Sequence, residues 1–124
     1  MDKLKQTAIE RHHADLMKSM DPLFVMDNLH AGLVSMAEKE TIKESYLTRR
    51  DRNRELISVL IRKREELEPF EHFVEALKKT DASHNIVAKT ILKTYKQYKG
   101  ATGNEIVSRT SLTGAEETNY GLQM

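Results

Sequence analysis

The feature that most constrains the fold is a series of short apolar stripes with helical spacing, separated by residues that begin or end helices. Apolar side chains recur every three or four residues up to about residue 98, without the alternation of strands and without a hairpin dipeptide. Pro22 and Pro69 interrupt this pattern where helices can start, and Gly32 lies where one can end. The sequence therefore predicts an all-α fold.

The stripes and caps predict six helices, over roughly 2–20, 21–31, 35–45, 48–67, 69–79 and 84–98. Helices this short are marginal alone, so their apolar faces must be buried against one another, and short connections make neighbours antiparallel. We expect a six-helix antiparallel bundle. Its predicted core consists of Leu16, Met20, Met26, Leu29, Ile42, Leu56, Leu60, Ile61, Phe73, Leu77, Val87 and Ile91.

The composition changes near the end of the last predicted helix. Residues 99–124 are rich in glycine, serine and threonine and poor in large apolar residues. Such a segment cannot bury enough apolar surface to form part of the core. We therefore expect one domain over residues 1–98 and a flexible tail or linker over residues 99–124.

Charge is separated into blocks although the net charge is only +1. Residues 49–64 carry seven cations and two anions, whereas residues 21–47 carry five anions and two cations. Three interpretations of the arginine-rich segment compete: a solvated helix face, a phosphate site, or a surface for carboxylate-rich proteins, which arginine binds bidentately. The near-neutral net charge argues against nucleic acid. Separated blocks of opposite sign favour charge-complementary docking between proteins.

No arrangement of residues indicates chemistry. The chain has no cysteine, and none of its five histidines has the spacing of a metal-binding pair on one helix. Nucleophile elbows, phosphate loops and dinucleotide fingerprints are absent. We expect no catalytic residues, no metal site, no cofactor and no enzymatic activity. No apolar run approaches the roughly 18 residues of a membrane span and the start lacks a secretory signal, so we expect a cytoplasmic protein without membrane contact.

Five segments resemble the caspase recruitment domain, a six-helix member of the death-fold superfamily. They are HHADL at 12–16, VMDNL at 25–29, GLVS followed by EKETI within 32–42, RRDRNREL at 49–56 and PFEHFVEAL at 69–77. The resemblance covers about residues 1–92 and is strongest to the recruitment domains of apoptotic protease-activating factors and initiator-caspase prodomains. It implies a six-helix bundle with the Greek-key topology of the death fold.

The resemblance also implies a function, homotypic assembly in apoptotic or inflammatory signalling. A basic face on the first and fourth helices would dock on an acidic face, on the second and third helices, of another recruitment domain or another copy. The basic face would consist of Arg11, Lys18, Arg50 and Arg54. The acidic face would consist of Asp27, Glu38, Glu40 and Glu44.

Two other interpretations stay open from the sequence. The chain could be the prodomain of an initiator caspase, with its last residues leading to a protease. Less favoured is a small nucleic-acid binder, which would use the arginine-rich helix together with Tyr95, Tyr98 and their neighbouring lysines. Two departures from the family pattern concern the fold: the usual glycine between the fourth and fifth helices is missing from residues 64–68, and Val87-Ala88 replaces the usual Leu-Ala pair of the sixth helix. A third concerns docking, because His13 stands where the first helix of the family has a basic residue.

Overall fold

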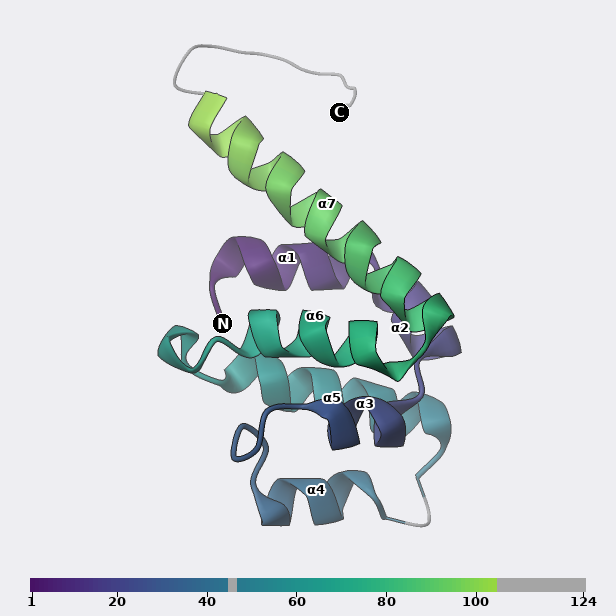
Figure 1. The fold of residues 1–124 in the computed structure, drawn as a ribbon. Helices are drawn as coiled ribbons and strands as arrows, with labels where there is room; N and C mark the ends of the chain where they lie inside the picture. The colour runs from purple at the N-terminus through teal and green to yellow at the C-terminus, as the bar shows by residue number, and fades with distance from the viewer. Residues whose placement is uncertain (45–46, 105–124) are drawn as a thin grey trace.

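The computed structural model describes residues 1–44 and 47–104. Over these residues it is all-α, without strands, which confirms the predicted fold class (Figure 1). In Figure 1, α6 crosses the middle of the bundle in front of α5, α1 lies on the upper side and α4 on the lower side. The elements are α1 (Lys3–Arg11), α2 (His13–Ser19), α3 (Pro22–Asn28), α4 (Met36–Ile42), α5 (Arg49–Arg62), the short 3-10 helix η1 (Glu65–Leu67), α6 (Pro69–Thr80) and α7 (Ala82–Asn104).

Side-chain caps begin the helices where the sequence predicted. Asp21 accepts a hydrogen bond from the backbone N–H of Phe24 and starts α3, with proline in its first turn. Ser35 and Glu38 form a complete capping box at the start of α4. Thr48 and Asp51 form another at the start of α5. Each cap satisfies backbone N–H groups that have no partner within the helix, which fixes where the helix begins.

The first predicted helix is wrong in one respect, because it is two helices, α1 and α2, joined at His12. The backbone of His12 leaves the helical region (φ −106°, ψ 19°), and its Nε2 lies 2.7 Å from Oγ1 of Thr94 on α7. Burial lowers the pKa of the His12 imidazole below its usual value, which favours the neutral ring. The apolar spacing allowed an unbroken helix, since the contact that accompanies the break comes from the other end of the domain.

The connection from α5 to α6 also differs from the prediction. The helix expected to reach residue 67 ends at Arg62, and the chain continues through η1. Glu68 then takes the left-handed conformation (φ 53°, ψ 51°) directly before Pro69. This is a conformation that glycine adopts without a steric penalty. Glu68 thus occupies, with a side chain, the kind of turn for which the family usually has glycine.

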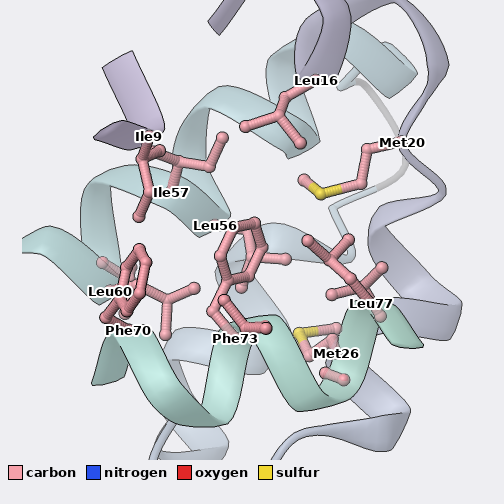
Figure 2. Packing of buried hydrophobic residues seen from close by; sticks show 14 of the residues in the cluster. Ile9, Leu16, Met20, Met26, Leu56, Ile57, Leu60, Phe70, Phe73 and Leu77 are labelled. Carbon is pink, nitrogen blue, oxygen red and sulfur yellow. The ribbon is translucent and has the colours of Figure 1, made fainter. Parts of the chain in front are cut away.

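The core agrees closely with the predicted set. Figure 2 shows side chains from α1, α2, α3, α5 and α6 meeting around Leu56 and Phe73. Every predicted core residue is buried except Leu29, Ile61 and Val87, which are half-buried and pack against the core. The core also takes in residues that the predicted set left out, among them Ile9, Val25, Leu33, Val34, Ile57, Val59, Phe70 and Val74.

Helix α7 begins before His84 and ends later than the periodicity suggested. It runs from Ala82 to Asn104 and so continues past the domain boundary expected at residues 98 and 99. Its N-terminal part, as far as Tyr95, packs on α6 and α1, and its C-terminal part extends beyond the bundle (Figure 1). The rest of the expected tail, residues 105–124, lies outside the described residues. None of the described helices is both long enough and apolar enough to span a membrane.

Candidate docking faces

The four residues of the expected basic face lie on three helices, of which α2 packs against both α1 and α5. Arg11 ends α1, Lys18 lies on α2, and Arg50 and Arg54 lie on α5. All four are exposed. Arg50 and Arg54 are four residues apart, so they share one face of α5. Arg54 Nη1 lies 3.2 Å from Oδ1 of Asp51 one turn earlier, a surface pair that leaves more than half of the arginine side chain accessible.

Two residues of α5, Asn53 and Arg49, attach α2 to α5, and neither was among the expected face residues. Asn53 is fully buried, and its Nδ2 donates to the carbonyl oxygens of Leu16, Met17 and Met20 at 3.0–3.3 Å. Nη2 of Arg49 donates to the carbonyl oxygen of Lys18 at 2.7 Å. The bonds to Met17, Lys18 and Met20 satisfy carbonyls at the C-terminal end of α2 that have no N–H partner within the helix, whereas the Leu16 carbonyl also accepts from the N–H of Met20. They also fix Lys18 beside the α5 turn that carries Arg50.

The arginines of residues 49–54 therefore form two groups, which differ in where their side chains point. Arg50 and Arg54 face solvent, whereas Arg49 and Arg52 donate to carbonyl groups of other segments. Arg52 is half-buried and reaches the C-terminal end of α4, where Nη2 donates to the carbonyl oxygen of Glu44 at 3.1 Å. Sequence reasoning treated the segment as one basic block, because charge counting cannot reveal which helix ends lie opposite each side chain.

Three residues of the expected acidic face are exposed. Asp27 lies near the end of α3, Glu40 on α4, and Glu44 just beyond the C-terminus of α4. Within the described part of the chain, none of the three forms an ion pair. A carboxylate without a partner in the monomer keeps its charge available for a partner molecule.

Glu38 is different, because it is already bound within the domain. Its Oε1 lies 2.8 Å from Nζ of Lys63 and accepts a bond of the same length from the backbone N–H of Ser35. The hydrogen bond from Lys63, followed by that from the Ser35 backbone, lowers the pKa of the Glu38 carboxyl below its usual range. Glu38 therefore serves the start of α4 and the contact with α5.

The two expected faces are not paired with each other within the monomer. In Figure 1, α1, which carries Arg11 of the basic face, lies on the upper side of the bundle, and α4, which carries Glu40 of the acidic face, lies on the lower side. Among the residues that the structure describes, no ion pair joins a member of the basic face to a member of the acidic face. The monomer therefore does not neutralise one face with the other, which leaves both able to meet partners of opposite charge.

Over the described residues the structure offers no cluster of three or more histidine, aspartate or glutamate side chains that could hold a metal ion. His30 and His72 stack with ring centroids 4.5 Å apart. His84 is buried between Asp81 and the backbone N–H of Asp21. Both arrangements link segments of the fold.

Residues 6–89, about two thirds of the chain, match the caspase recruitment domain family. The chain belongs to this family. A recruitment domain is a non-catalytic module that joins proteins through homotypic binding to other recruitment domains in signalling. No curated protein and no solved structure matches the chain. The bundle described above is the form that such a module takes in this chain.

Proposed function

We propose that this recruitment domain assembles cytoplasmic signalling complexes, apoptotic or inflammatory, by docking its basic face on the acidic face of another recruitment domain. The basic face consists of Arg11, Lys18, Arg50 and Arg54, and the acidic face of Asp27, Glu40 and Glu44, with Glu38 beside them. The observation that carries the proposal is that, over the described residues, no ion pair joins a residue of one face to a residue of the other. Such a molecule has one basic and one acidic docking surface. The basic surface of one copy therefore contacts the acidic surface of the next, in a head-to-tail arrangement.

The nucleic-acid interpretation has less support. A stacking platform needs aromatic rings whose faces are open to bases. Tyr95 is half-buried, and its ring packs against Phe70 with centroids 5.3 Å apart. The amino groups of Lys5 and Lys99 lie about 6 Å from the Tyr95 ring. This tyrosine thus belongs to the contact between α6 and α7.

The test uses copies of this chain that lack one face each. Arg54→Glu removes the basic face and Asp27→Arg removes the acidic face, while Arg62→Glu is the matched control. Arg62 is exposed on the same helix, and within residues 1–44 and 47–104 the bond of its side chain is to Ser58 one turn earlier. Sedimentation and calorimetry then measure association of each protein alone and in mixtures.

Each reversed variant alone should associate at least about tenfold more weakly than the unsubstituted chain, because a docked like charge costs several kcal/mol. Their mixture should form a one-to-one pair, since Arg54→Glu keeps its acidic face and Asp27→Arg keeps its basic face. Arg62→Glu should associate normally, and all three variants should keep the thermal midpoint of the unsubstituted chain. Equal association of Arg54→Glu and the unsubstituted chain would contradict the assignment of the basic face.

A further inference from the structure

Helix α4, which carries Glu40 of the acidic face, is attached to α5 at both of its ends. Near its start, Glu38 lies 2.8 Å from Nζ of Lys63. At its end, Nη2 of Arg52 donates to the carbonyl oxygen of Glu44 at 3.1 Å, with a longer contact of 3.5 Å to that of Lys43. Among the seven residues of α4, only Ile42 is buried in the core. A helix with one buried anchor depends on such end contacts for its position.

Arg52 cannot serve the basic face from where it lies. On a helix, positions two residues apart point about 200° apart, so Arg52 points away from the face shared by Arg50 and Arg54. Its Nε is shielded from solvent, and the side chain is half-buried. Arg50 and Arg54 are exposed. The guanidinium of Arg52 is therefore directed to α4 and away from the surface that a partner of the basic face would cover.

The contact suits the chemistry of a helix end. The last carbonyl groups of a helix lack N–H partners and carry partial negative charge, so a cation there is stabilising. Arginine can reach two neighbouring carbonyls with one nitrogen of its planar group. Arg52 makes this contact at Lys43 and Glu44, the residues immediately after α4, and the Glu44 carbonyl also accepts from the backbone N–H of Leu47. Arg52 thus holds the backbone from which the Glu44 side chain projects.

We propose that Arg52 is a positioning residue for the acidic face, although it belongs to the arginine-rich segment of the basic-face helix. The inference rests on the proposed function, because it concerns how the acidic face is held for docking. The charge of Arg52 alone would suggest that its removal weakens docking at the basic face. The proposal predicts instead that its removal weakens docking at the acidic face and leaves docking at the basic face unchanged.

The first measurement needs no partner. Amide hydrogen exchange is compared for the full chain, Arg52→Met, and Arg62→Met as a control that removes the same charge elsewhere on α5. The reporters are the N–H groups of Lys43 and Glu44, which bond to Lys39 and Thr41 in the last turn of α4. We expect these amides to exchange about tenfold faster in Arg52→Met and at the normal rate in Arg62→Met. Equal rates in all three proteins would overturn the positioning role.

The second measurement uses the single-face copies. The Asp27→Arg copy can dock only by its basic face, so it probes the acidic face of the protein under test. The Arg54→Glu copy probes the basic face. Arg52→Met should bind the first probe about tenfold more weakly and the second within about twofold of normal. Loss toward the Arg54→Glu copy alone would assign Arg52 to the basic face, and equal loss toward both would indicate general damage to the fold; either result overturns the proposal.

Failure of the proposed function has a different signature. In that case the unsubstituted chain itself binds neither probe, and the docking role of Arg52 falls with it. The failure of the present inference alone is seen as normal binding of both probes by the unsubstituted chain and by Arg52→Met. A retained thermal midpoint in Arg62→Met, with both probes bound normally, shows that the loss of an arginine from α5 is not by itself disruptive.

Discussion

The side-chain nitrogen of Asn53 lies 3.0 Å from the carbonyl oxygen of Met20, in a part of the bundle closed to solvent. The same nitrogen donates to the carbonyl oxygens of Leu16 and Met17. A polar residue in this position stabilises the fold only because the end of α2 needs donors, since buried carbonyls without partners are costly.

Replacing Asn53 with leucine should lower the free energy of unfolding by about 2–4 kcal/mol, because the carbonyls of Met17 and Met20 lose their buried donor and that of Leu16 keeps only the N–H of Met20. Asn53→Asp should cost more, since it places a carboxylate against those carbonyl oxygens. Urea denaturation at neutral pH measures both. Asn85→Ala, at a half-exposed position on α7, is the control and should change stability by less than about 0.5 kcal/mol. If Asn53→Leu also changed the free energy of unfolding by less than about 0.5 kcal/mol, the hydrogen bonds of Asn53 would contribute little to stability.

Glu68→Gly should stabilise the domain by about 1 kcal/mol, because glycine takes the left-handed conformation at φ 53° without the steric cost that a side chain carries. Glu66→Gly, two residues earlier in η1, removes the same charge from a residue without a positive φ. It should therefore destabilise by about 0.5–1 kcal/mol. The measurement is the thermal midpoint of each variant. Changes of the same sign in both would rule out backbone strain at Glu68 as the cause.

Asp81 gives the domain a defined acid sensitivity. Hydrogen bonds from the backbone N–H of His84, and then from the His84 and Ser83 side chains, lower the pKa of the Asp81 carboxyl to about 2. Its pKa in the unfolded chain is higher, near 3.8. The stability that this carboxylate contributes is therefore complete above about pH 4 and is lost as the pH falls from about 4 through 2.

Asp81→Asn separates this contribution from those of other carboxyl groups, because asparagine can still cap α7 but does not titrate. The unsubstituted chain should be the more stable protein at pH 6. The difference in the free energy of unfolding should shrink steadily between pH 4 and pH 2. Urea denaturation at several pH values measures it, and a difference that stays constant over this range would contradict the assignment.

Glu38 and Glu40 should respond oppositely to neutralisation. Glu38→Gln should lower the free energy of unfolding by about 1 kcal/mol, because glutamine can keep the capping box but loses the ion pair with the largely buried Lys63. Its effect on docking should be small. Glu40→Gln should leave stability unchanged within about 0.5 kcal/mol and weaken association severalfold. Denaturation and calorimetry on both variants check this; stronger loss of docking in Glu38→Gln would make Glu38 a direct contact.

The sequence was sufficient for those features that depend on local chemistry. The caps at Asp21, Ser35 and Thr48 were recognisable because each uses a side chain within three residues of the N–H group that it binds. The apolar stripes predicted most of the core, because burial of one helix face follows from a period of 3.6. The family resemblance was likewise carried by short segments in a fixed order, and the family match supports it.

Features that depend on contacts between distant segments could not be predicted. The break at His12 involves Thr94, more than eighty positions away along the chain, and the residues next to His12 do not predict it. The division of the arginine-rich segment is similar, since Arg49 and Arg52 differ from Arg50 and Arg54 only in which helix ends lie opposite them. The face assignments themselves stay predictions, because only binding of a partner can test them.

The attachment of α4 to α5 has a geometric consequence for any larger assembly. Arg50 and Arg54 project from α5, and the same helix holds α4 at both ends through Arg52 and Lys63. If copies stack head to tail, the incoming and outgoing contacts of every copy are thus set by a single rigid rod. The rotation and rise from one subunit to the next would then be constant, so repetition of that step gives a ring where the rotation closes and a helical filament of uniform pitch where it does not.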